Sequence, residues 1–407
     1  MGSDQQKRIG RFSRRDILRI SAVVGVAAAI VPLVSYFLNA SQSKGANACR
    51  PWPHWNEFIK KHIDSTGRVI DFLNPDLRTT SEGQSYGLFF ALVNNDISLF
   101  ERLLSWTVYY LCEGHLDQRL PAWLWGQADD KQWKILDDNT ASDADIWIAY
   151  CLLEAGRLWE RNSYTNAGIQ LLQLIKKAEV VDIQGIGMML SPGLRGFITP
   201  ESWTMNPSYL PIMVLRRCAL ADPSGPWSVI AENAIRVISE SAVNGFSPDW
   251  TAWNGEKFIV DTSRGNLGSY DAIRVYLWAG MLNEQDPAQK KILPNLAGPD
   301  RLLKKQPDLP ERIDVDAGTG SGQAPLGFSG ALLPYLAALK DDTALADQNK
   351  RIPSPEKTSS SEALHYYDRM LILFGQGWYE ERFRFTADGS LQPAWRLSSC
   401  SVIKSSP

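Results

Sequence analysis

The hydrophobic and polar positions of this 407-residue chain repeat mainly with helical spacing. Apolar residues recur three and four positions apart in eleven segments, whereas the strict alternation typical of half-buried strands is scarce. The pattern predicts helices at 52–63, 82–94, 97–112, 143–160, 163–177, 207–219, 227–242, 270–282, 286–292, 326–339 and 361–375. We therefore expect an all-α fold in which helical hairpins repeat around a ring.

The helices predicted near 82, 143 and 270 are apolar nearly all round, as inner helices of such a ring must be. Helices 163–177 and 227–242 have a polar face and are expected outside. The polar, Pro- and Gly-rich segment 299–322 predicts a long surface loop. Residues 382–385 alternate and lead into the turn sequence 386–389, which predicts a small C-terminal β-hairpin.

The three most apolar predicted helices each carry a carboxylate in the first turn: Glu82, Asp143 and Asp271. Each is preceded by a candidate N-cap: Ser81, Ser142 and Ser269. Ser81 with Gln84 also fits a capping box. Acids are common at helix starts because the helix dipole stabilises an anion by ~0.3–1 kcal/mol. Their repetition is more informative: if these helices are parallel neighbours, the three acids gather on one face.

The first 48 residues have the features of an export signal. Residues 13–18 resemble the twin-arginine consensus, an uncharged run covers 20–38, and Ala46-Asn47-Ala48 fits a signal-peptidase site. The run is also long enough for an uncleaved membrane anchor, but it is only weakly apolar. We expect cleavage before Cys49, a periplasmic or secreted bacterial protein without stable membrane insertion, and one catalytic domain over 49–407.

Removing this segment changes the charge balance. It holds seven Lys or Arg and two acidic residues, so residues 49–407 have 35 basic and 43 acidic residues and a net charge of −8. This excludes nucleic acid and anionic membranes as expected partners, whereas a neutral polymer would not be repelled.

The five cysteines and four histidines show no metal-binding spacing. Three cysteines lie in apolar helical segments and are expected as buried thiols: Cys112, Cys151 and Cys218. Cys49 and Cys400 lie at the ends of the mature chain, where a disulfide and two free thiols are both compatible with an oxidising compartment. The sequence has no complete calcium loop, G-x-S-x-G, P-loop or dinucleotide motif, so we expect neither metal nor cofactor.

Glycoside hydrolysis is the remaining chemistry that needs only carboxylates. One carboxylic acid protonates the leaving oxygen, and an ionised carboxylate activates water or attacks the sugar. At a helix start the dipole should lower the pKa of Glu82, so an acid role requires desolvation and a neighbouring anion to outweigh it. Asp143 or Asp271 could supply that anion.

Fifteen tryptophans agree with a sugar substrate, because flat aromatic faces with a polar edge suit pyranose rings. For Trp123 and Trp125, a sugar platform and core packing both remain open. For Trp147, Trp159 and Trp278, which lie within predicted helices, we expect core packing.

Four sequence blocks resemble signatures of glycoside hydrolase family 8: Ser81-Glu82-Gly83-Gln84-Ser85-Tyr86-Gly87, residues 141–150 (ASDADIWIAY), Asn206-Pro207-Ser208-Tyr209 and Ser269-Tyr270-Asp271-Ala272-Ile273-Arg274. The resemblance extends from about Trp52 to Trp395. It is greatest to the periplasmic endoglucanases encoded with bacterial cellulose synthases, through residues 120–126, 246–250 and 373–378.

The resemblance implies an (α/α)6 barrel whose cleft lies at the N-terminal ends of the inner helices, and an inverting endo-β-1,4-glucanase. By position, Glu82 is similar to the general acid and Asp271 to the general base. Asp143 resembles the carboxylate that holds the distorted sugar, although that residue has also been regarded as nucleophile or base. The sequence leaves open which of the two aspartates activates water.

Four further residues match family positions that line the cleft: Trp123, Tyr209, Tyr270 and Arg274. We expect Trp125 and Asp145 to bind substrate as well. The implied partners are β-1,4-glucan chains, with a functional association with the cellulose synthase complex. Two alternatives remain: a glucan-binding partner of the synthase without catalysis, and a family relative acting on xylan, chitosan or mixed-linkage glucan.

Overall fold

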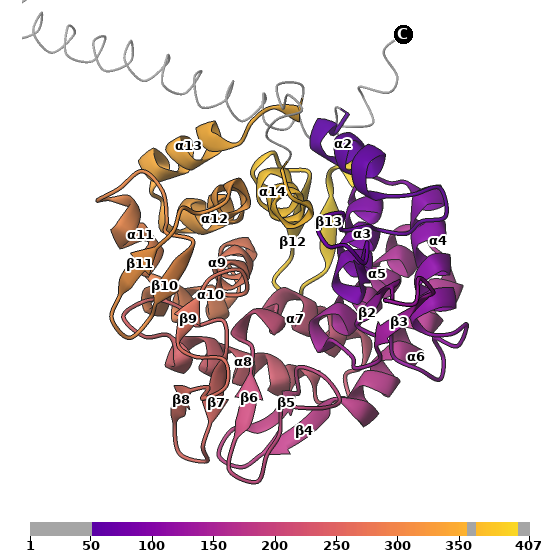
Figure 1. The fold of residues 1–407 in the computed structure, drawn as a ribbon, viewed down its shortest axis with the longest axis horizontal. Helices are drawn as coiled ribbons and strands as arrows, with labels where there is room; N and C mark the ends of the chain where they lie inside the picture. Colours follow the sequence, from indigo (N-terminus) through magenta and orange to yellow (C-terminus); the bar gives the residue numbers. More distant parts are fainter. Residues whose placement is uncertain (1–50, 356–363, 398–407) are drawn as a thin grey trace, which may run out of the picture.

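The computed structural model describes residues 51–355 and 364–397, and their helices form a ring of inner and outer members (Figure 1). The inner helices are α3 (Ser81–Val93), α5 (Ser142–Leu158), α7 (Ile212–Ala221), α9 (Ala272–Met281), α12 (Leu326–Leu339) and α14 (Tyr366–Tyr379). The outer helices are α2 (Pro53–His62), α4 (Ile97–Trp106), α6 (Asn162–Ala178), α8 (Trp227–Ser241), α10 (Pro287–Ile292) and α13 (Asp342–Arg351). Shorter helical turns are η1 (Thr107–Leu111), η2 (Pro207–Tyr209), η3 (Leu293–Leu296), α11 (Gly298–Leu303) and η5 (Ala394–Arg396).

Three inner helices, α3, α5 and α9, are buried almost completely, as their continuous apolar sequences predict. In α3 every residue except Glu82 is buried, in α5 every residue except Arg157, and in α9 all residues are buried. Aromatic rings fill the centre of the ring: the Phe374 ring of α14 lies 5.7 Å from Trp147 of α5 and 5.1 Å from Trp278 of α9. Core packing of these two tryptophans is therefore confirmed, and each buried aromatic contributes about 1.5–3 kcal/mol.

Short antiparallel sheets occupy most of the connections that lead into the inner helices. The strands are β1 (Thr79–Thr80), β2 (Leu124–Gln127), β3 (Trp133–Asp137), β4 (Val180–Ile183), β5 (Gly187–Leu190), β6 (Trp203–Met205), β7 (Thr251–Trp253), β8 (Phe258–Val260), β9 (Leu267–Gly268), β10 (Arg312–Asp314) and β11 (Thr319–Ser321). They pair in the orders β1-β2-β3, β4-β5, β6-β7-β8 and β11-β10-β9. The strands that directly precede α3 and α9 place these sheets at the helix N-termini, where the predicted acids lie.

The expected C-terminal hairpin is present as β12 (Phe383–Phe385) and β13 (Leu391–Pro393), and it packs at the other end of the ring. The Tyr150 hydroxyl of α5 donates a hydrogen bond of 3.0 Å to Gly389 O in the hairpin turn. Gly389 has φ +81°, and a Cβ there would lie 1.9 Å from Met213 O of α7. Only glycine therefore allows the turn to approach α7 this closely.

The predicted helix boundaries agree with the structure to within a few residues in most cases, but one expectation is wrong and two features were not predicted. Segment 299–322 is not one loop, because it contains most of α11 together with β10 and β11. Helix α13 was not predicted, because its sequence is polar and buries only Leu345 and Gln348. The small sheets were also missed, since strands of two to five residues are too short to show an alternating pattern.

Helix α14 begins at Tyr366, whereas a start at 361 was predicted. The export signal, Cys49 and Cys400 lie outside the described residues. Cys112, Cys151 and Cys218 are free and buried, as predicted. Within 51–355 and 364–397, no helix has the length and apolar character needed to cross a bilayer.

Candidate active site

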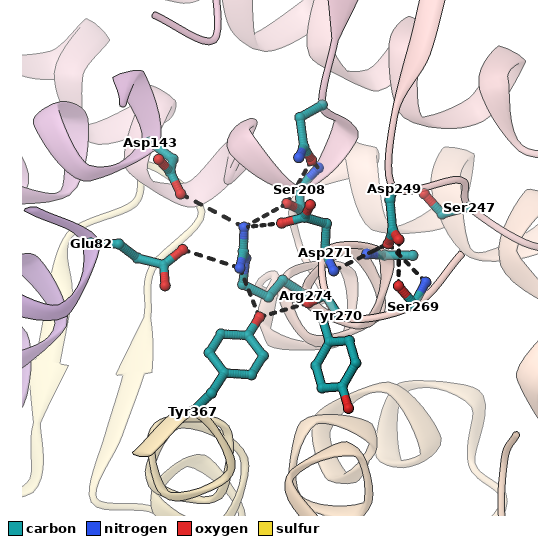
Figure 2. Close-up of polar contacts among 12 residues, drawn as sticks. Glu82, Asp143, Ser208, Ser247, Asp249, Ser269, Tyr270, Asp271, Arg274 and Tyr367 are labelled. Atoms are coloured by element: carbon teal, nitrogen blue, oxygen red, sulfur yellow. Dashed lines mark hydrogen bonds and ion pairs between the residues drawn. The ribbon is translucent and has the colours of Figure 1, made fainter. Parts of the chain in front are cut away.

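The three predicted carboxylates meet at one buried arginine (Figure 2). Arg274 Nη1 lies 3.1 Å from Glu82 Oε2, and Arg274 Nη2 lies 2.8 Å from Asp271 Oδ1. Arg274 Nη2 also lies 3.8 Å from Asp143 Oδ2. Residues almost 190 positions apart in sequence therefore share one charged group at the N-terminal ends of α3, α5 and α9.

The guanidinium group is fixed from two further sides. Nη1 donates a hydrogen bond of 2.7 Å to the Tyr367 hydroxyl, which in turn donates one of 2.7 Å to Tyr270 O. Nη2 donates one of 3.0 Å to Ser208 Oγ. Arg274 is only 3% exposed, so its planar fork of donors is held in one orientation. Figure 2 shows Glu82 and Asp271 on opposite sides of this group.

The helix caps differ from the predicted ones. Thr80, not Ser81, caps α3 by accepting a hydrogen bond of 3.1 Å from Gly83 N. Gln84 forms no capping box, because its Oε1 accepts a hydrogen bond of 2.7 Å from Val69 N. Ser142 is the first residue of α5, whose start has no side-chain cap. The three serine caps were therefore wrong, although each acid does lie at the start of its helix.

The start of α9 is capped by a residue from another loop. Asp271 occupies the N-cap position, but its side chain makes no capping hydrogen bond and contacts Arg274 instead. Asp249 replaces it, because its carboxylate accepts hydrogen bonds from the backbone nitrogens of Ser269, Asp271 and Ala272. The predicted cap Ser269 is thus a donor to Asp249.

Burial resolves the conflict between the helix dipole and an acid role. Desolvation raises the pKa of Glu82, the charge of Asp271 raises it further, and Arg274 opposes both. Desolvation, together with the charge of Glu82, raises the pKa of Asp143 to about 8 despite Arg274. A site with three carboxylates and one guanidinium therefore favours bound protons, as acid catalysis requires.

Asp143 differs from the other two acids in its surroundings. It is 2% exposed, and neither of its oxygens has a hydrogen-bond partner among the described residues. Buried carboxylate oxygens are normally paired, so this group is suited to accept hydrogen bonds from hydroxyl groups of a ligand.

The two candidate tryptophan platforms have different environments. Trp123 is half-buried just before β2, and its backbone oxygen accepts a hydrogen bond of 3.0 Å from Ser81 N next to Glu82. Trp125 is buried, stacked 5.1 Å from Trp133, and covered by the Arg68 guanidinium at 4.5 Å. This covering favours core packing over a sugar platform at Trp125.

The other predicted substrate-binding residues do not all reach the arginine. The Tyr209 ring lies 5.9 Å from the Arg274 guanidinium. Tyr270 is exposed, and its hydroxyl donates a hydrogen bond of 3.0 Å to Glu311 Oε1. Asp145 is fully buried and lies beside the carboxyl group of Glu179.

Sequence reasoning missed three residues of the site: Ser208, Asp249 and Tyr367. Ser208 and Asp249 lie inside blocks that carried the family resemblance, 206–209 and 246–250, but no further sequence signal indicated their roles. Tyr367 lies in the predicted helix 361–375, and nothing in its local pattern distinguishes it from a packing residue. Within the described part of the chain, no three His, Cys, Asp or Glu side chains are grouped so that they could hold a metal.

Known proteins resemble this chain in sequence and in fold. The family Glycosyl hydrolases family 8 matches residues 26–381. The chain belongs to this family. An endoglucanase of Xanthomonas axonopodis pv. citri is 54% identical over 96% of this chain and 100% of its own length. An endoglucanase of Escherichia coli K12 is 43% identical over 89% of this chain and 96% of its own.

Among solved structures, the endo-1,4-D-glucanase of Vibrio fischeri superposes with a TM-score of 0.81 at 41% identity, covering 85% of this chain and 99% of that one. The endo-beta-1,4-glucanase CMCax of Acetobacter xylinum superposes with a TM-score of 0.68 at 25% identity, covering 82% and 97%. The all-α fold and the (α/α)6 barrel are thereby confirmed, and this family 8 member is a glycoside hydrolase.

Proposed function

We propose that this family 8 member is an inverting endo-β-1,4-glucanase that hydrolyses internal bonds of cellulose-like glucan. The observation that carries the proposal is the convergence of Glu82, Asp143 and Asp271 on Arg274, with a different environment for each acid. The names of the similar proteins, endoglucanase and endo-1,4-D-glucanase, support β-1,4-glucan as the substrate.

Glu82 acts as the general acid in this proposal. Its raised pKa keeps a proton on the carboxyl group at a pH where an exposed glutamate has lost it. Glu82 donates this proton to the glycosidic oxygen as the bond to the anomeric carbon breaks. Arg274 Nη1 contacts Oε2 at 3.1 Å, so we assign the transferable proton to Oε1.

Asp271 acts as the general base. It is ion-paired with Arg274 at 2.8 Å and is more exposed than Asp143, as suits a charged group that must reach water. Asp271 takes a proton from water while the water oxygen attacks the anomeric carbon from the face opposite the leaving group. Glu82 and Asp271 contact different nitrogens of the guanidinium, and the proposal requires the roughly 6.5–9.5 Å separation of an inverting pair.

Asp143 holds the sugar at the cleavage point. Beside the 3.8 Å ion pair with Arg274, its buried oxygens make no hydrogen bond among the described residues, so they keep acceptor sites for sugar hydroxyls whether the carboxyl group is charged or protonated. Tyr209, whose pKa is raised by desolvation and by the nearby charge of Asp143, supplies an aromatic face, and we expect Trp123 to supply another. Hydrogen bonds that strengthen as the ring distorts would stabilise the transition state.

We also propose a place for this activity. The N-terminal features of the sequence support export to the periplasm or the medium, and the resemblance of residues 120–126 and 373–378 supports action during bacterial cellulose synthesis and export. The net charge of −8 after residue 48 is compatible with an uncharged glucan chain and supports neither nucleic acid nor anionic membrane as a partner.

The test is hydrolysis of a substrate panel, with the anomer of the first product followed by NMR. Cellopentaose and carboxymethylcellulose should be cut, with initial release of the α-anomer, while xylan, chitosan and mixed-linkage glucan should be cut more slowly. Initial release of the β-anomer would overturn inversion, and preference for another polymer would overturn the substrate. Equal release of reducing ends by wild type and Glu82→Gln would instead favour a non-catalytic glucan-binding role.

A further inference from the structure

Helices α3, α5 and α9, which carry the three acids, differ in how their N-terminal backbone amides are capped. Helix α3 uses Thr80, two residues before Glu82, and α5 has no side-chain cap. Helix α9 uses Asp249, which lies 22 positions before Asp271. Among these three starts, only that of α9 is held by a carboxylate from a different segment.

The Asp249 carboxylate makes four contacts with the turn that carries Asp271. Oδ1 accepts hydrogen bonds from Ser269 N at 2.8 Å, Asp271 N at 3.1 Å and Ala272 N at 2.7 Å, and Oδ2 accepts one from Ser269 Oγ. Hydrogen bonds to an ionised acceptor are roughly twice as strong as neutral ones. The backbone of Asp271 is thus fixed directly, by its own amide.

Asp249 is itself held against the helix. Its backbone nitrogen donates a hydrogen bond of 2.7 Å to Leu267 O, and Ser247 N donates one of 2.9 Å to the Tyr276 hydroxyl of α9. A Cβ on Gly268 would lie 2.5 Å from Ser247 O, so glycine permits this close approach. Hydrogen bonds therefore join the loop to the first turns of α9.

A carboxylate at this position has an electrostatic cost. Desolvation raises the pKa of Asp249, and the nearby charge of Asp271 raises it further. A serine, threonine or asparagine caps a helix about as well as aspartate does and would avoid this repulsion. However, a neutral cap offers fewer acceptor sites than the two oxygens of a carboxylate, which here meet four donors.

We propose that Asp249 is a positioning residue for hydrolysis: it takes over the capping of α9, so that the Asp271 side chain is free to bind Arg274 and face the substrate. This inference rests on the proposed role of Asp271 as the base. An aspartate at an N-cap ordinarily bonds its own helix amides, which would turn it away from the arginine. Capping from another loop removes that competition.

The test compares Asp249→Ala, Asp249→Asn and Asp96→Ala. Asp96 caps the outer helix α4 through Leu99 N at 2.9 Å and is the matched control for loss of a cap. Asp249→Ala should lower kcat on cellopentaose by about 10²-fold, because small misplacements of reacting groups have effects of this size. Its KM should change less than twofold. Asp249→Asn, which keeps one acceptor oxygen, should recover part of kcat, and Asp96→Ala should retain wild-type kcat.

Hydrogen exchange supplies a readout that does not depend on the substrate. In Asp249→Ala, amides of residues 269–274 should exchange faster, while those at the start of α3 should not change. An unchanged exchange rate, or a kcat equal to that of Asp96→Ala at the same melting temperature, would overturn the inference. A wild-type protein inactive on every glucan, with faster exchange in the variant, would overturn the proposed function but retain the positioning of Asp271.

Discussion

The two ends of α5 carry two buried charge clusters that are built in opposite ways. At its N-terminal end, Asp143 shares one arginine, Arg274, with two further acids. At its C-terminal end, about 16 Å away along the helix, the fully buried Glu154 is shared by Arg217 at 2.6 Å, by Arg157, and by Leu391 N at 2.6 Å.

The Glu154 cluster is arranged to stabilise the fold, whereas the Asp143 cluster is arranged to bind protons and a ligand. Glu154 has partners on both oxygens, and it joins α5 to α7 and to the hairpin strand β13. The Asp143 cluster has an excess of acid, unpartnered oxygens and raised pKa values. Unsatisfied groups of this kind destabilise a fold, and they are retained where a ligand and a proton are to be handled.

The largest expected effect is on catalysis at the acid-rich end. Glu82→Gln keeps the shape of the side chain but removes the proton that we propose Glu82 transfers, so kcat should fall about 10²–10⁴-fold. The melting temperature should stay near that of wild type, since Arg274 keeps its ion pair with Asp271 and its hydrogen bonds to Tyr367 and Ser208. Reducing-end release and differential scanning calorimetry check the two parts. A change in melting temperature alone would contradict the division between the two clusters.

Glu154→Gln is the counterpart at the other end of the helix. It leaves the guanidinium of Arg217 buried without a charged partner, so the free energy of unfolding should fall by about 3–5 kcal/mol. The variant that remains folded should have wild-type kcat. Chemical denaturation measures the first quantity, and activity corrected for the folded fraction measures the second. Loss of kcat in fully folded protein would show that this cluster also serves catalysis.

Asp143→Asn should stabilise the protein at alkaline pH. Because burial raises the pKa of Asp143 to about 8, the folded state holds a proton that the unfolded chain releases near pH 4. Wild-type stability therefore falls as pH rises from about 4 to about 8, by up to about 1.36 kcal/mol per unit of pKa difference. The variant lacks this loss, so its advantage should grow across that window in thermal unfolding curves. An advantage that is constant with pH would contradict the assignment.

The smallest effect concerns the support of Arg274. Tyr367→Phe removes the hydroxyl that accepts from Arg274 Nη1 and donates to Tyr270 O, so kcat should fall about tenfold, as for the loss of ~1.5 kcal/mol. Tyr150→Phe removes a hydroxyl bonded to Gly389 O at the opposite end and serves as the control. Steady-state kinetics on cellopentaose should show the decrease only for Tyr367→Phe.

Sequence patterns were sufficient to predict the elements that bury regularly spaced apolar side chains. Helices such as α12 and the hairpin β12–β13 could be predicted because their apolar spacing and turn residues act within a few positions. The same signals failed for α13, whose polar sequence buries only two side chains, and for the strands of two to five residues, whose hydrogen bonds are completed by neighbouring segments. Ser81 and Ser142 were taken for caps because a sequence pattern locates the start of a helix only to within one or two residues.

The sequence by itself determined that three apolar helices begin with acids, and the motifs around Glu82, Asp143 and Asp271 identified their family. Only the tertiary structure decided the environment of each carboxyl group. Burial, the position of Arg274 and the cap supplied by Asp249 come from segments far apart along the chain. Desolvation and charge act through space over a few ångströms, so they depend on the packed ring and not on the order of residues.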